Sequence, residues 1–200
     1  KRYDKASKLI KTGEKKYKEE CAVLERLLKH MEDGAPARTL ELSEEEKELV
    51  RGFSLLSMKP MIYAANVEED ALSGVENNAL VAQVRQAAQK EGAEVVVVSA
   101  KVEEELAQLE DEERTMFLNE LGLESAGLDR LVEASYRLLG LISYLTAGPK
   151  EVRAWTIEKG TKAPQAAGKI HSDFEKGFIR AEIVTYEDLV ACGSIAAARE

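Results

Sequence analysis

The sequence is poor in the residues that cross-link a chain or anchor it in a membrane. Its two cysteines, Cys21 and Cys192, lie far apart in unlike surroundings, so they form neither a disulfide framework nor a metal-binding cluster. No apolar run approaches the roughly 20 residues that a membrane helix needs. The charged start, Lys1-Arg2, is followed by no signal peptide. We therefore expect a globular, cytoplasmic protein without a membrane partner. Because the sequence does not begin with Met, an upstream targeting segment and an organelle stay open.

The charge is negative overall but unevenly spread. A net charge of −9 argues against DNA as a partner. However, residues 1–18 hold eight Lys or Arg and only two acidic residues, whereas residues 101–133 hold three Lys or Arg and eleven acidic residues. Residues 148–180 are mildly basic, with seven Lys or Arg and four acidic residues. Basic surfaces on this acidic chain are therefore candidate contact sites for a large anionic partner.

Residues 1–33 are predicted to form a helical hairpin. Apolar residues in steps of four and three define a coiled-coil seam, and they are Tyr17, Cys21, Leu24, Leu28 and Met31. Thr12-Gly13 interrupts the rhythm, because glycine readily takes the left-handed conformation that ends a helix. The tip carries Lys11, Lys15, Lys16 and Lys18. These lysines form either a solvated face or a contact site for a large anionic partner.

The middle of the chain is predicted to contain a parallel sheet. Ser43 and Glu46 form a capping-box pattern, which predicts a helix from residue 44 that Lys59-Pro60 stops. Apolar runs at 61–65 and 95–98 flank a predicted helix over 75–91. A strand, a helix and a strand with continuous apolar strands are typical of a parallel sheet that is buried on both faces. Two more helices are predicted over 103–121 and 127–139.

The pattern changes from residue 141 onward. Two apolar segments, 141–146 and 152–157, flank a Gly148-Pro149 turn with the spacing of a hairpin. A helix is predicted around 163–170, and a third strand over 178–184. A hairpin, a helix and a strand together indicate a small α+β module.

Polar residues follow both strands of the predicted parallel sheet. Asn66-Val67-Glu68-Glu69 ends the first strand, and Ser99-Ala100-Lys101 ends the second. Ligands of parallel sheets sit at the carboxyl ends of the strands, so both signals point to one place. The pair resembles the base-recognition loops of P-loop GTPases, where the first loop reads Asn-Lys-x-Asp. Here Glu69 replaces the Asp that selects guanine, whereas an Asn side chain can pair with N6–H₂ and N7 of adenine. The alternative is that Asn66 only caps the helix or turn after the strand.

Four longer strings carry a specific resemblance. Residues 59–69, Lys-Pro-Met-Ile-Tyr-Ala-Ala-Asn-Val-Glu-Glu, resemble the Obg-like ATPase family, known in bacteria as YchF, which has Asn-x-x-Glu in this loop. Residues 146–157, 160–171 and 173–182 are similar to the TGS domain of that family. The resemblance implies a ribosome-associated protein that binds and hydrolyses ATP, with some GTP activity. It also implies that Asn66, the backbone of Val67, and Glu69 face the base, with Ser99, Ala100 and Lys101 packed around the base and ribose.

The sequence departs from this family in one respect. It contains no Gly-x-x-x-x-Gly-Lys-Ser/Thr, the loop that holds phosphates and supplies a hydroxyl for Mg²⁺. We therefore expect a fragment whose Mg²⁺-binding and catalytic residues lie outside this sequence. The expected fold is α/β, with a coiled-coil arm and return helix at 1–57, the C-terminal half of a P-loop NTPase sheet at 58–140, and an incomplete β-grasp TGS domain at 141–200.

A second function stays open, namely a non-catalytic module that binds ribosome or RNA through the arm and the TGS surface. Trp155 is predicted to be core or half-buried packing in the hairpin, but its basic neighbours leave room for RNA contact. Arg153 and Lys162 are the candidates there. The carboxylates of residues 103–105 and 110–113 are predicted to be solvated.

Overall fold

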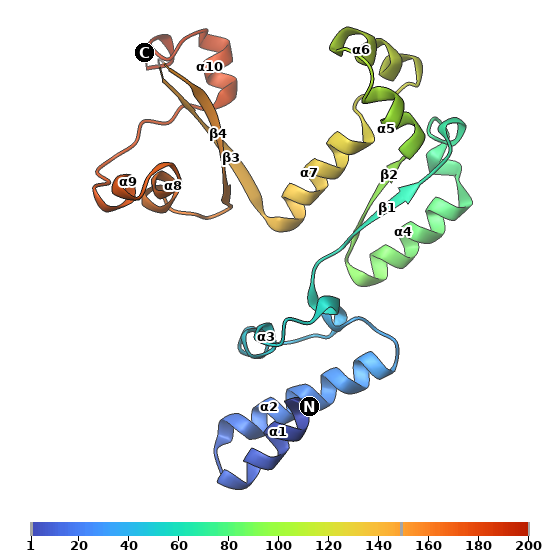
Figure 1. Cartoon of the computed structure of the whole chain (residues 1–200), viewed down its shortest axis with the longest axis vertical. Helices are drawn as coiled ribbons and strands as arrows, with labels where there is room; N and C mark the ends of the chain where they lie inside the picture. Colours follow the sequence, from blue (N-terminus) through green and yellow to red (C-terminus); the bar gives the residue numbers. More distant parts are fainter. Residues whose placement is uncertain (1, 149, 200) are drawn as a thin grey trace. The chain divides into compact units, whose positions relative to one another are not determined.

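The computed structural model describes residues 2–148 and 150–199, which divide into two compact units, Lys1–Leu138 and Leu139–Glu200. Both units mix helices with one two-stranded sheet (Figure 1). The sheet of the first unit is parallel and that of the second is antiparallel, so the predicted mixture of α and β structure is confirmed. Among the described residues, no helix is long and apolar enough to cross a membrane.

The first unit begins with the predicted helical hairpin. Helix α1 (Arg2–Leu9) and the short η1 (Ile10–Thr12) lead to α2 (Lys15–Glu32). Gly13 has a φ of 82° and donates its N–H to the Ile10 carbonyl, so it ends the first arm in the left-handed conformation that was expected of it.

The predicted seam is right only for the part of α2 that faces α1. Cys21 and Leu24 are buried there with Ala6, whereas Leu28 and Met31 are 44% and 40% exposed. Helix α1 has eight residues, so it is too short to cover the far part of α2. That part packs instead against the segment that returns from the hairpin, in a second cluster whose buried residues are Val23, Leu27, Ala37 and Val50.

The return segment contains η2 (Ala37–Thr39), α3 (Glu44–Arg51) and η3 (Leu56–Met58). The capping box is present as predicted: Ser43 Oγ accepts from the Glu46 N–H, and the Glu46 carboxylate accepts from the Ser43 N–H. The prediction that Lys59-Pro60 stops this helix was wrong. The helix ends at Arg51, and Ser54 takes a φ of 50°, which turns the chain away from the helical path.

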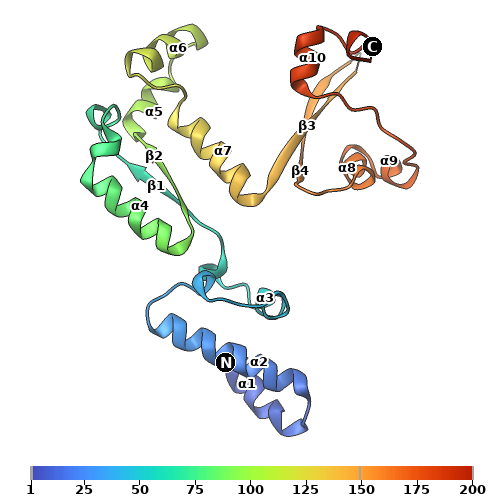
Figure 2. The ribbon, with the colours of Figure 1, turned by 180° about the vertical axis from the view of Figure 1, so that it is seen from behind.

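The parallel sheet consists of β1 (Ile62–Asn66) and β2 (Glu94–Val98), with Ile62 opposite Glu94 and Asn66 opposite Val98. Their connection contains η4 (Glu69–Ala71), η5 (Val75–Asn77) and α4 (Ala79–Glu91). Helix α4 lies alongside the two strands in both views (Figures 1 and 2). The strand–helix–strand order is therefore as predicted.

Two details of this region differ from the prediction. The strands are not buried on both faces, since β2 buries Val96 and Val97 whereas Ala64 of β1 is exposed. Helix α4 starts only at Ala79, after the Asn78 side chain caps it. Leu80 of this helix is 71% exposed, and the buried residues of α4 are Val81 and Ala88.

The predicted helix over 103–121 is in fact two helices, α5 (Ala100–Leu106) and α6 (Asp111–Glu120). Glu110 between them has an extended backbone, with a ψ of 161°. The break lets both helices fold over one apolar cluster, whose buried residues are Leu72, Val102, Leu106 and Ala126. Helix α7 (Gly127–Leu139) has the bounds that were predicted, and it runs along β2, since Arg137 pairs with Glu94.

The second unit contains the predicted hairpin, β3 (Leu141–Ala147) and β4 (Val152–Glu158), and the predicted helix α8 (Ala163–Ile170). Pro149 of the predicted turn lies outside the described residues. Helices α9 (Ser172–Lys176) and α10 (Tyr186–Cys192) and the short η6 (Ala197–Arg199) follow. The strand predicted over 178–184 was wrong: that stretch is irregular, and Ile179 and Ile183 are 91% and 86% exposed. Among the described residues no strand pairs with this stretch, so its backbone has no ladder to join.

Candidate functional site

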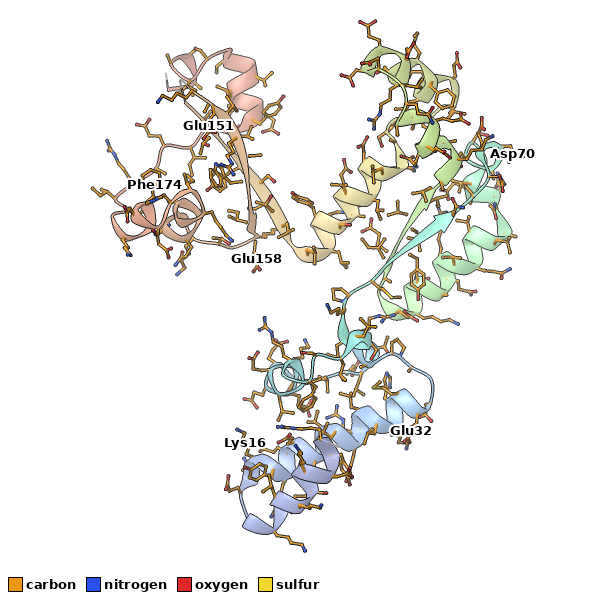
Figure 3. All side chains as sticks on the ribbon, viewed as in Figure 1. Lys16, Glu32, Asp70, Glu151, Glu158 and Phe174 are labelled. Carbon is orange, nitrogen blue, oxygen red and sulfur yellow. The ribbon has the colours of Figure 1, made fainter. Side chains whose placement is uncertain are left out.

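The two predicted base-recognition loops lie next to each other. We call residues 66–69 the first loop and residues 99–101 the second loop. The Val67 N–H donates to the Val98 carbonyl at 2.9 Å, which extends the parallel pairing one residue beyond Asn66. The second loop therefore begins beside Val67, at the carboxyl edge of the sheet, as expected for a parallel pair. Figure 3 shows Asp70 in the turn that continues the first loop.

Asn66 joins the two loops directly. Its Oδ1 accepts a hydrogen bond from the Ala100 N–H at 2.9 Å, across 34 positions of sequence. Asn66 thus caps the start of α5 rather than a turn of its own. Within the described residues its amide nitrogen makes no hydrogen bond, and the residue is exposed. One end of the side chain is used for structure, and the other is available as a donor.

Val67 is held in place on two sides. Its N–H is used by Val98, and its side chain packs against the apolar cluster around Leu72 and Val102. In the described part of the chain, the Val67 carbonyl accepts no hydrogen bond. The backbone that carries this free acceptor is therefore held in place, one residue after the Asn66 amide donor.

Glu69 and Lys101 form the second link between the loops. Lys101 Nζ donates to Glu69 Oε2 at 3.0 Å. Glu69 is the first residue of η4, and its side chain is 36% exposed, against 62% for that of Lys101. The hydrogen bond to Glu69, together with the field of that carboxylate and of Glu105, raises the pKa of Lys101 above its ordinary value. The lysine is therefore a firmly charged partner for Glu69.

Ser99 is the most enclosed residue of the site. It is 2% exposed, and its hydroxyl has no hydrogen-bond partner among the described residues. It precedes α5 but does not cap that helix by its side chain, and the first N–H of the helix, that of Ala100, donates to Asn66 instead. A buried hydroxyl without a partner is uncommon in folded proteins.

Glu103 is a residue of this region whose role the sequence did not indicate. It was predicted to lie on a solvated face. Instead its two carboxylate oxygens accept from the N–H groups of Gly127 and Leu128, at 2.7 and 3.1 Å. A carboxylate at these free N–H groups caps α7 and complements the positive end of the helix. Glu103 thus fixes α7 to the helix that follows the second loop.

A shallow depression beside the two loops is acidic. Its lining includes four carboxylates, those of Glu68, Glu69, Asp70 and Glu120, and a single lysine, Lys101. Such a lining repels phosphate groups but tolerates an uncharged ring. The described residues contain no group of three or more side chains arranged to hold a metal ion. The lining therefore suits a neutral, hydrogen-bonding group better than a phosphate.

The basic tip of the helical hairpin is exposed. Lys11, Lys15, Lys16 and Lys18 all lie near the Gly13 turn, and Figure 3 labels Lys16 on the hairpin. Lys15 pairs with Glu19 at 3.3 Å, but its side chain remains 90% exposed. The lysines predicted as a contact site thus lie exposed in η1 and at the start of α2.

The hairpin of the second unit places Arg153 over Trp155. The guanidinium carbon lies 4.4 Å from the ring centroid, and the indole N–H donates to Thr146 Oγ1 at 2.9 Å. Trp155 is half-buried, as predicted. Lys162 stands at the residue that precedes α8 and is exposed. Stacked arginine and aromatic groups are one means of binding RNA bases.

Comparison with known proteins identifies close relatives. The family model YchF-GTPase_C, described as a protein of unknown function (DUF933), matches residues 141–200. The "Ribosome-binding ATPase YchF" of Bacillus subtilis is 52% identical over 200 residues, which are 100% of this chain and 55% of the relative. The protein of the same name from Escherichia coli O157:H7 is 54% identical over 186 residues, 93% of this chain and 50% of the relative.

A solved structure agrees with these relatives. The structure of the Schizosaccharomyces pombe YchF GTPase matches with a TM-score of 0.80 at 36% sequence identity, over 92% of this chain and 49% of that one. The chain thus spans about half the length of the relatives that it matches.

Proposed function

This chain belongs to the YchF family, and on that premise we propose that the full-length protein containing it binds and hydrolyses ATP, with some activity toward GTP, in association with ribosomes in the cytoplasm. In this proposal the chain supplies the base-binding side of the nucleotide site. The phosphate-binding, Mg²⁺-binding and catalytic residues are assigned to sequence outside these 200 residues. There, water would attack the γ-phosphoryl group in line with the leaving group.

The observation that carries the proposal is the donor and acceptor pair at the end of β1. Because Ala100 engages Asn66 Oδ1, the Asn66 side chain is left to donate through its amide nitrogen. The acceptor beside it is the Val67 carbonyl. Adenine presents an acceptor, N7, next to a donor, N6–H₂, whereas guanine presents two acceptors, N7 and O6, on the same edge. The pair therefore complements adenine and leaves the Val67 carbonyl facing an acceptor in guanine.

The surroundings of the pair support the same assignment. The second loop contributes Ser99, whose buried hydroxyl is unpartnered in the described chain, and Ala100, whose small side chain leaves the approach open. The acidic depression nearby disfavours phosphates, which suits the base end of a nucleotide site. Glu69 and Lys101 complete the rim of the site.

Asn66→Ala in the full-length protein tests this assignment. The loss of one hydrogen bond to the base is expected to weaken ATP binding by about tenfold, since such a bond contributes about 1 kcal/mol or slightly more. The same variant with unaltered ATP affinity would contradict the proposed site. An unfolding measurement on the variant shows whether the protein is still folded.

The alternative is a module that binds ribosomal RNA without hydrolysis as its main task. The exposed lysines around Gly13 and the Arg153–Trp155 stack favour it. Measuring ribosome association with and without ATP distinguishes the two functions. Association that needs bound ATP supports the ATPase, and association that is the same in both conditions supports the module.

A further inference from the structure

The pairing of Glu69 with Lys101 bears on which base the site selects. The two side chains come from different loops, 32 positions apart in sequence, and meet at 3.0 Å. Within residues 2–148 and 150–199, the Glu69 carboxylate accepts no other side-chain hydrogen bond. The position of this carboxylate therefore depends on Lys101.

A carboxylate without a partner in the first loop would favour guanine over adenine. A carboxylate only accepts hydrogen bonds. Guanine offers two neighbouring donors, N1–H and N2–H₂, whereas adenine has an unprotonated N1 at the corresponding place. Glu69 in an unpaired state would thus attract guanine and repel the lone pair of adenine N1. Paired with an ammonium group, the same carboxylate does neither.

We infer that Lys101 is a positioning residue for base selectivity, which holds the Glu69 carboxylate away from the base and thereby favours adenine over guanine. The inference rests on the proposed function, because it requires a purine to bind at the two loops. It assigns to Lys101 a role beyond packing against the base and ribose. In this view the effect of Glu69 on base selectivity comes from its pairing with Lys101 as well as from the length of its side chain.

The size of the effect follows from the exposure of the pair. Both side chains are partly in water, and ion pairs of this kind contribute modestly. The selectivity that Lys101 adds is therefore about three- to fivefold. Lys101 also offsets the charges of the nearby Glu68 and Glu105. Removing the Lys101 ammonium group should therefore weaken the binding of both ATP and GTP. The ratio of the two affinities is the quantity that reports on Glu69.

The test compares four variants of the full-length protein in competition binding with fluorescent ATP and GTP analogues. Lys101→Met keeps the aliphatic stem and removes the ammonium group, so the affinity ratio should move toward GTP by about three- to fivefold. Adding Lys101→Met to Glu69→Gln should produce no such shift, because the carboxylate is already gone. Lys90→Met removes an exposed lysine of α4 and controls for net charge. If Lys101→Met lowers the unfolding midpoint, Lys101→Gln replaces it.

The outcomes separate this inference from the function beneath it. An unchanged ratio in Lys101→Met, or an equal shift in the presence of Glu69→Gln, would overturn the inference alone, provided that Asn66→Ala weakens ATP binding. Binding that is insensitive to Asn66→Ala would remove the proposed base site, and the inference with it. A shift in Lys101→Met that disappears on the Glu69→Gln background would establish the role of Lys101.

Discussion

Asn66 and Ala100 are joined by a hydrogen bond of 2.9 Å between the side-chain carbonyl of one and the backbone N–H of the other. The bond connects the ends of two adjacent parallel strands. It gives Asn66 a structural task in addition to the proposed contact with the base, so the two tasks can be separated by mutation.

Asn66→Asp keeps the acceptor for Ala100 and removes the amide donor. We expect its stability to stay close to that of the wild type, while ATP affinity falls. Asn66→Ala removes both groups and should also lower the free energy of unfolding by about 1 kcal/mol. Denaturant unfolding and ATP titration of the two variants check this. Equal loss of stability in both would show that the acceptor is unimportant.

Glu103 should stabilise the fold through the start of α7. Glu103→Ala leaves the N–H groups of Gly127 and Leu128 without their acceptor, and we expect a loss of about 1 kcal/mol in unfolding free energy. Glu104→Ala, on the exposed side of the same helix, is the matched control and should be nearly neutral.

Gly127 is expected to tolerate no side chain. A Cβ there would lie 2.8 Å from Glu103 Oε1 and 2.9 Å from Val98 Cγ1. Because Val98 belongs to β2, it cannot move aside without disturbing the sheet. Gly127→Ala should therefore cost more stability than Glu103→Ala, measured under the same unfolding conditions. A neutral Gly127→Ala would contradict this packing of α7.

The carboxylate of Glu91 should make stability depend on pH. It is held by Arg38, which links the return segment to α4, and it accepts from the Tyr63 hydroxyl at 3.0 Å. Both hydrogen bonds, that from Arg38 first, lower the pKa of Glu91 below its usual 4.5. The charged form therefore favours the folded state above this value, and the contribution is lost as the pH falls through the lower pKa of the folded protein.

Thermal unfolding between pH 7 and pH 3 checks this dependence. The midpoint of the wild type should fall more steeply below about pH 4.5 than that of Glu91→Gln, which has no charge to lose. Glu45→Gln, an exposed carboxylate of α3, should behave as the wild type does. Parallel curves for wild type and Glu91→Gln would show that the contact with Arg38 is not made in solution.

The tip of the helical hairpin is the predicted contact with the ribosome. Reversing the charges of Lys15 and Lys16 to Glu should reduce ribosome co-sedimentation at low salt by tenfold or more, since each contact with phosphate adds to a salt-sensitive affinity. Reversing Lys59 and Lys90, which are exposed elsewhere in the first unit, is the control. Equal binding by both double variants would exclude the tip.

Local signals predicted a good part of this fold, because the cause lay within a few residues. The capping box of Ser43 and Glu46 and the left-handed Gly13 are set by the local backbone, and both are present. Predictions failed where a partner was decisive. In the part of the chain that the structure describes, Leu28 fits the seam but has no helix opposite it, and Ile183 fits a strand but has no neighbouring strand.

The candidate site was predictable in its place but not in its contacts. Two strands that end in polar loops imply that Asn66 and Ser99 lie at one edge, and the parallel pairing confirms that the loops adjoin. The bonds of Asn66 to Ala100 and of Glu69 to Lys101 depend on side-chain geometry across more than 30 positions, which no local pattern encodes. The role of these residues in binding a base stays a prediction.

Competition between ATP and GTP for the full-length protein tests the central claim most directly. We predict that ATP is preferred, and that Asn66→Ala weakens ATP more than GTP, because the amide donor and the Val67 carbonyl match adenine. A preference for GTP that Glu69→Asp leaves unchanged would contradict the account, since the first loop would then read guanine despite its longer carboxylate.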